Sequence, residues 1–130
     1  MNRGYTAQFC CFCRFRGGDV RGNVLAGLPD ARQTEQFETL LHQGSLRIER
    51  IVSCGQATAE GHWYDQDHDE WIVVLSGGAR LRIDNETDLL QLGVGDWLHL
   101  PAHCRHRVDW TEPHRETVWL ALHWNREKEA

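Results

Sequence analysis

The sequence predicts an all-β protein with a single domain that closes into a sandwich or a barrel. Three observations support this: a chain of 130 residues, short β-rich runs beyond Gly44, and turn residues that separate those runs at regular spacing. A chain of this length fits one hydrophobic core, because domains are commonly about 100–150 residues long. Several short strands with turn signals between them are typical of β-folds that close on themselves.

Each expected strand has its own pattern. The segment 46–53 begins with alternation at Leu46 and Ile48, and 71–75 is an unbroken apolar run of strand length. The segment 79–83 alternates strictly, with Arg80 and Arg82 on the opposite face from its apolar residues. A hairpin loop at 84–87 and a turn at 93–95 separate the strands that follow. Those strands are expected at 88–92, 96–100, 106–110 and 117–124.

The N-terminal third lacks this pattern. Residues 1–19 are rich in Arg and have no periodicity, so we interpret them as a disordered leader rather than an organelle-targeting segment or a secretory signal. Residues 20–45 are predicted to form an N-terminal arm. Within it, residues 36–41 are compatible with either a short helical turn or an extended segment.

Composition excludes several classes of protein. Fourteen basic and nineteen acidic residues give a net charge of -5, which argues against a nucleic-acid partner. No apolar run approaches the roughly 18–20 residues that a membrane span needs, so we predict no membrane association. Five cysteines, an odd number, and no visible signal peptide favour a reducing cytoplasm over a disulfide framework.

Two motifs in the C-terminal half contain the main candidate functional residues. Glu70 and Gly77 satisfy the pattern E-x6-G, and Gly95, Pro101 and His106 satisfy G-x5-P-x4-H. With these motifs the sequence resembles the cupin superfamily, and more narrowly its small single-domain cupin-2 proteins of unassigned function. The resemblance spans about residues 46–124. It implies a small jelly-roll β-barrel over 46–125, a divalent transition metal inside it and a homodimer.

The first motif departs from the family at its two usual histidines. Those positions fall on Tyr64 and Gln66, or on Trp63 and Asp65 with a looser spacer. We therefore predict a metal site of Glu70, His106, Gln66 and Tyr64 for Fe, Mn, Ni or Zn, with the ion held weakly or absent, because phenol and amide are poorer ligands than imidazole. In the second motif His103 replaces a glycine and Trp110 replaces an asparagine.

Other residues near the motifs have alternative interpretations. His62 and His68 are either substitute ligands or exposed loop residues, and we interpret His99, His114 and His123 as structural. A ligand pocket is predicted at Trp63, His103 and Trp110 beside the metal site. Four arginines are candidates to bind a substrate carboxylate: Arg80, Arg82, Arg105 and Arg107. For Arg80 and Arg82, a solvated strand face is the simpler interpretation.

Two classes of function remain open. In the first, the protein is a metal-dependent cupin enzyme, of an oxygenase, isomerase or lyase type, that acts on a small polar molecule. In the second, it is a non-catalytic module that binds a small ligand and has lost its metal. The fold alone does not choose between them, because one fold hosts many chemistries.

Overall fold

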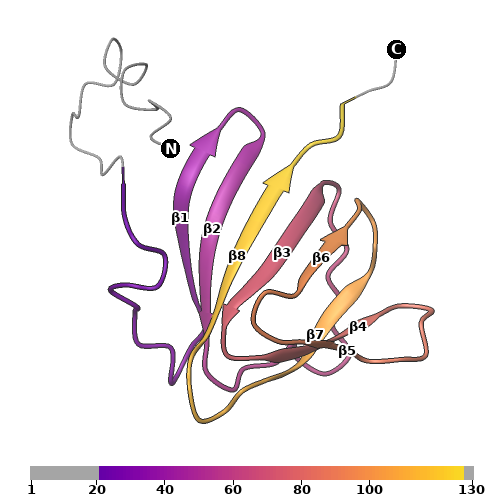
Figure 1. The fold of residues 1–130 in the computed structure, drawn as a ribbon. Coiled ribbons are helices and arrows are strands. Elements are labelled where there is room, and N and C mark those ends of the chain that lie inside the picture. The colour runs from indigo at the N-terminus through magenta and orange to yellow at the C-terminus, as the bar shows by residue number, and fades with distance from the viewer. Residues whose placement is uncertain (1–20, 128–130) are drawn as a thin grey trace, which may run out of the picture.

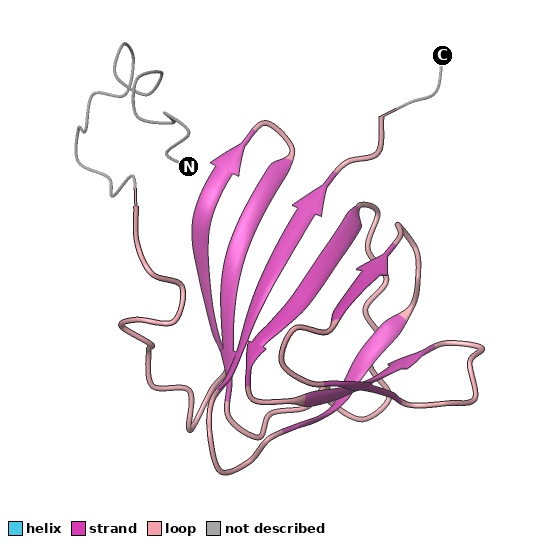
Figure 2. Ribbon diagram, viewed as in Figure 1, coloured by secondary structure: helices cyan, strands magenta, loops and turns pink. Residues whose placement is uncertain are grey.

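The computed structural model describes residues 21–127, which form eight strands and no helix (Figures 1 and 2). Within that range no helix is available that could span a membrane. The strands are β1 (Gln36–Gln43), β2 (Leu46–Ser53), β3 (Asp69–Ser76), β4 (Ala79–Ile83), β5 (Leu90–Leu92), β6 (Trp97–Leu100), β7 (His106–Thr111) and β8 (Thr117–Trp124).

The strands form two antiparallel sheets. The larger has the order β1-β2-β8-β3-β6 and the smaller the order β5-β4-β7. The smaller sheet lies towards the β3–β6 side of the larger one, and β1 and β2 lie at the other side (Figure 1). This arrangement confirms the predicted all-β jelly-roll fold, but the two sheets do not close into a continuous barrel.

Strand alternation builds the core between the sheets. Ile72 and Val74 of β3 share one face with Trp119 of β8, and Leu81 of β4 meets them from the smaller sheet; all four are buried. Burying an aliphatic side chain of this size stabilises a fold by roughly 1.5–3 kcal/mol. The expected strands 46–53, 79–83 and 117–124 have the observed bounds.

The remaining expected strands differ from the structure by a few residues at their ends. The segment expected at 88–92 shortens to Leu90–Leu92, and the run expected at 71–75 lengthens to Asp69–Ser76. Residues 36–41 belong to edge strand β1, so the extended alternative is confirmed. The predicted leader at 1–19 lies outside the described residues.

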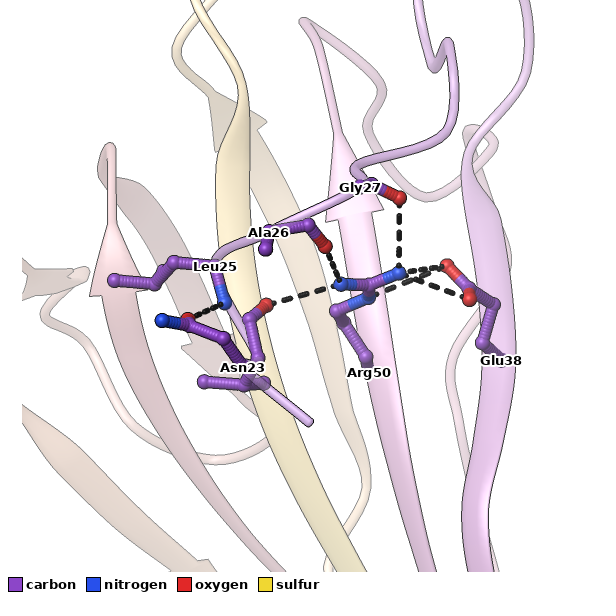
Figure 3. A network of polar contacts seen from close by, with 7 residues as sticks. Asn23, Leu25, Ala26, Gly27, Glu38 and Arg50 are labelled. Carbon is purple, nitrogen blue, oxygen red and sulfur yellow. Dashed lines mark hydrogen bonds and ion pairs between the residues drawn. The ribbon is translucent and has the colours of Figure 1, made fainter. Parts of the chain in front are cut away.

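Arg50 fastens the segment before β1 to the outer side of the larger sheet (Figure 3). Its side chain is buried, and Nη1 donates to the carbonyls of Val24 (3.1 Å) and Ala26 (2.7 Å). Nη2 donates to the carbonyl of Gly27 (3.3 Å) and to the Glu38 carboxylate (2.8 Å). A buried guanidinium requires such partners, because an unpaired buried charge is costly.

Candidate functional site

A cavity of about 270 Å³ lies between the two sheets. The four predicted metal ligands, Tyr64, Gln66, Glu70 and His106, all line it. The structure therefore brings these four residues to one place, although their role as ligands stays a prediction. Tyr64 is 43% exposed, which places it at the mouth of the cavity.

Strand pairing explains why Glu70 meets residues that are distant in sequence. In the larger sheet Glu70 of β3 lies opposite His123 of β8, and His123 lies opposite Arg47 of β2. All three line the cavity from the same face of the sheet, as does Glu49, two residues after Arg47.

His106 approaches from the smaller sheet. Its backbone exchanges two hydrogen bonds with Tyr64, at 2.8 and 3.1 Å, and the Tyr64 ring stacks on the His106 ring with centroids 5.5 Å apart. Nδ1 of His106 lies 2.8 Å from the carbonyl of Cys104. Because a carbonyl only accepts, this contact assigns the proton to Nδ1, and in the neutral ring Nε2 is left as an acceptor.

Glu70 and His106 face one another across a gap. Oε2 of Glu70 lies 3.9 Å from Nε2 of His106, and their side chains are 10% and 7% exposed. This separation exceeds a hydrogen bond. Within the described chain no donor bonds the Glu70 carboxylate, so two acceptors face a common space.

The cavity disfavours negative charge. Burial raises the pKa of Glu70, with His123 and His106 acting against the shift and Glu49 adding to it. Burial also raises the pKa of Glu35, opposed by a hydrogen bond from Ser53. Such shifts are common where a protein holds a group ready for binding or proton transfer.

His123 contributes to this site, although its position in the sequence suggested a structural role. Its Nδ1 lies 3.0 Å from Nε2 of His68, and its Nε2 lies 2.9 Å from Oε1 of Glu49. The signal available in the sequence was strand alternation, because His123 shares a face with Trp119 and Ala121. His68 bonds to His123 and does not line the cavity.

The residues of the predicted ligand pocket lie elsewhere. Trp63 lines a second hollow together with His62, and the guanidinium of Arg105 lies 5.6 Å from its ring centre. The guanidinium of Arg80 lies 4.6 Å from the ring centre of Trp110. Neither Trp110 nor His103 lines the cavity between the sheets. A ligand-binding role for Trp63, His103 and Trp110 remains a prediction.

His103 stands where the family motif has glycine, and the backbone explains the position. Its φ is +63°, in the left-handed region that glycine adopts most easily. Its backbone N–H donates to the carbonyl of Gln66 at 2.6 Å, which ties the second motif to the first. Its ring is paired with Asp65 at 2.9 Å.

The four candidate arginines are already partnered. Arg82 and Arg107 both bond to Asp109, at 3.0 and 2.6 Å, and Arg105 bonds to Asp84 at 3.0 Å. Arg80 donates to Gln91 at 3.0 Å. None of them lines the cavity, so their placement favours a surface role.

The donor set lacks two of the imidazoles of the metal centre that the resemblance implied. Among residues 21–127 no three His, Cys, Asp or Glu side chains are grouped so that they could hold a metal ion. Glu70 and His106 supply two strong donors, whereas Tyr64 and Gln66 are neutral oxygen or amide groups at the positions of two imidazoles. The chemistry that the arrangement supports directly is acceptance of hydrogen bonds and exchange of protons.

Comparison with known proteins assigns the family. A family model described as a cupin domain matches residues 50–123. The chain belongs to the cupin family. The resemblance found in the two motifs is thus confirmed.

Solved structures agree with this assignment. A protein from Ralstonia eutropha, provisionally named a mannose-6-phosphate isomerase, is 47% identical, with a TM-score of 0.79 over 82% of this cupin and 98% of that chain. A cupin superfamily protein from Desulfitobacterium hafniense is 20% identical, with a TM-score of 0.66 over 83% and 94% of the two chains. The second likeness shows the fold alone. Among curated proteins, no match was found.

Proposed function

We propose that this cupin binds a small polar molecule in the cavity between its sheets, with the molecule's donor groups in the gap between Glu70 and His106. The observation that carries the proposal is the Glu70 carboxylate, nine-tenths buried and without a hydrogen-bond donor in the described chain. The carboxylate lines the cavity and is not bonded to another group of the described chain, so it is available to a ligand. A ligand hydroxyl or amine can donate to it.

The cavity has the features of a site for a hydroxylated molecule. Its carboxylates accept hydrogen bonds from hydroxyl groups, and its walls include the aromatic side chains of Tyr64 and Trp119. The name of the Ralstonia eutropha relative suggests a sugar as the ligand and an isomerase as the activity. An isomerase needs a group that moves a proton, and Glu70, whose pKa is raised by burial, is suited to that role.

A divalent ion at the same gap is the second candidate. His106 supports it, because Nδ1 is held by the Cys104 carbonyl and Nε2 faces Glu70, the orientation that metal-binding histidines commonly adopt. Gln66 and Tyr64 would complete the set. With two strong ligands the ion would be held weakly, and such an ion would polarise a bound carbonyl or hydroxyl.

Elemental analysis of protein purified without a His tag distinguishes the two candidates. A transition ion at a substantial fraction of one per chain, reduced in Glu70→Gln and unchanged in Glu86→Gln, would support the metal-dependent function. Metal-free protein that takes up no Fe, Mn, Ni or Zn, yet binds sugars through Glu70, would support direct binding. Glu86 is an exposed residue of the loop between β4 and β5 and serves as the matched control.

A further inference from the structure

The carboxylates that line the cavity outnumber the Lys and Arg side chains that line it. Three carboxylates, those of Glu35, Glu49 and Glu70, line it, whereas Arg47 is the one Lys or Arg side chain that residues 21–127 contribute to the lining. Nε of Arg47 lies 4.0 Å from Oε2 of Glu49, and His123 bonds the other oxygen of Glu49 at 2.9 Å. At this distance Arg47 Nε makes no hydrogen bond, so Glu49 has no close partner in Arg47, and the three carboxylates outnumber the one arginine by two.

Glu35 is held in place by a short chain of hydrogen bonds. Ser53 Oγ donates to Oε2 of Glu35 at 2.6 Å, and Nε1 of Trp119 donates to Ser53 Oγ at 3.1 Å. Ser53 and Trp119 are both buried. The carboxylate is thus oriented by neutral groups, which leave its negative charge uncompensated.

Glu70 gives an independent indication of a ligand. It is nine-tenths buried, lines the cavity and accepts no hydrogen bond within residues 21–127. Nε2 of His106, 3.9 Å away, is an acceptor when the ring is neutral. A group that satisfies both must donate in two directions, which an ammonium does with three N–H bonds and a hydroxyl with one does not.

From this arrangement we propose that the cavity selects a small organic ammonium, such as an amino sugar, whose positive group lies against Glu70, while Glu35 and Glu49 add to the negative charge of the lining. This inference rests on the proposed binding function and specifies its ligand class. Tyr64 and Trp119 line the same cavity, and their rings can contact a cation favourably. An anionic ligand would instead approach a lining in which three carboxylates face a single arginine.

The test uses three sugars that share a ring and differ in charge: mannosamine, mannose and mannose 6-phosphate. Each is titrated into the full chain by calorimetry at pH 7 with a chelator present, so that no divalent ion contributes. We expect mannosamine to bind about tenfold more tightly than mannose, a difference of about 1.4 kcal/mol, and mannose 6-phosphate to bind most weakly. Glu70→Gln and Glu35→Gln should each remove most of the preference for mannosamine, and Glu86→Gln should retain it.

Two failures are distinguishable. If mannose or mannose 6-phosphate binds at least as tightly as mannosamine, and Glu70→Gln weakens that binding, the ammonium inference is wrong and the proposed binding function stands. If none of the three binds at millimolar concentration, both are wrong. Thermal melting of each variant shows whether it is folded. If a folded Glu35→Gln variant loses the binding of all three sugars equally, the charge argument is contradicted.

Discussion

At the scale of single residues, neighbouring acids in β3 experience opposite environments. Asp69 is buried and accepts hydrogen bonds from Arg126 (2.7 Å), His99 (2.9 Å) and the backbone N–H of Ala102 (3.1 Å). Chiefly because of Arg126, the pKa of Asp69 lies well below its usual value. Glu70 points to the other face, lacks such donors and has a raised pKa. Alternation along one strand thus separates a structural carboxylate from a carboxylate of the candidate site.

Asp69→Asn should therefore destabilise the protein. A carboxylate with a lowered folded-state pKa stabilises the fold above its unfolded pKa, about 3.9, and this contribution is lost as the pH falls through the folded-state pKa. We expect a loss of about 1–3 kcal/mol at pH 7, the range for hydrogen bonds to charged groups. Urea unfolding at pH 7 and at several values below pH 4 measures it. An equal loss at every pH would contradict the electrostatic explanation.

Glu70→Gln should have the opposite effect on stability. A carboxylate with a raised folded-state pKa favours the fold when protonated, below the unfolded value of about 4.5, and that contribution is lost as the pH rises through the folded-state pKa. The variant should be more stable than wild type at pH 7–8 by about 0.5–2 kcal/mol, the usual gain when a functional site is relieved of strain. The difference should shrink towards pH 4. A variant less stable than wild type at pH 8 would show that Glu70 is not destabilising.

At the scale of elements, the loop before β3 determines which side chains reach the cavity. Tyr64 and Gln66 line it, whereas Trp63 lines another hollow and is paired with a surface arginine. The tighter of the two motif registers therefore places both of its residues in the lining of the cavity. The antiparallel bridge between Tyr64 and His106 holds this part of the loop beside the cavity.

Tyr64→His/Gln66→His tests that register. Two imidazoles beside Glu70 and His106 would supply a three-His-one-Glu set, which should raise the affinity for Ni²⁺ or Zn²⁺ by at least about tenfold, because imidazole suits these ions better than phenol or amide. Missing partners for the new rings limit the gain. The matched control is Trp63→His/Asp65→His, which should leave the affinity unchanged. Metal titration followed by calorimetry measures both, and a reversed order would favour the looser register.

Gly77, which ends the first motif, has a backbone role. Its φ is +82°, and a Cβ at this position would overlap Thr117 and the carbonyl of Glu116. Gly77→Ala should therefore destabilise the protein by about 1–3 kcal/mol or more, because a strained conformation and a steric overlap coincide. Gly22→Ala, where a Cβ would meet nothing within 4 Å, is the control. Chemical denaturation of both variants measures the difference, and equal stabilities would refute the packing role.

At the scale of the whole molecule, the sequence predicted one half of the site better than the other. Tyr64, Gln66, Glu70 and His106 follow from two motifs with fixed spacing, and strand alternation indicates their shared face. Residues from the other side of the cavity, such as Glu35, Arg47 and Glu49, could not be found in this way. Arg47 and Glu49 line the same cavity as Glu70 because β2 and β3 both pair with β8, a pairing between distant segments that no local pattern encodes.

The outer face of the larger sheet is a candidate contact surface for the predicted homodimer. Trp71 and Trp97 stack there with ring centres 5.9 Å apart, and Trp97 is 61% exposed. Val73 and Leu120, paired on neighbouring strands, point to the same side. Trp71, Val73 and Leu120 are half-buried, and an exposed tryptophan beside such apolar side chains on one face is typical of an interaction surface. We propose that this face contacts a second copy of the chain.

Trp97→Ser should then convert a dimer into a monomer of 15.0 kDa. Aromatic residues near the centre of an interface commonly contribute 2 kcal/mol or more to binding, which is about a thirtyfold or greater weakening. Sedimentation velocity over a range of protein concentrations measures the change. Val94→Ser is the control, because Val94 is 66% exposed but lies in the turn between β5 and β6 and not on a strand of that face. If wild type sediments as a monomer at all concentrations, or if Val94→Ser dissociates the dimer as readily, another surface or none mediates assembly.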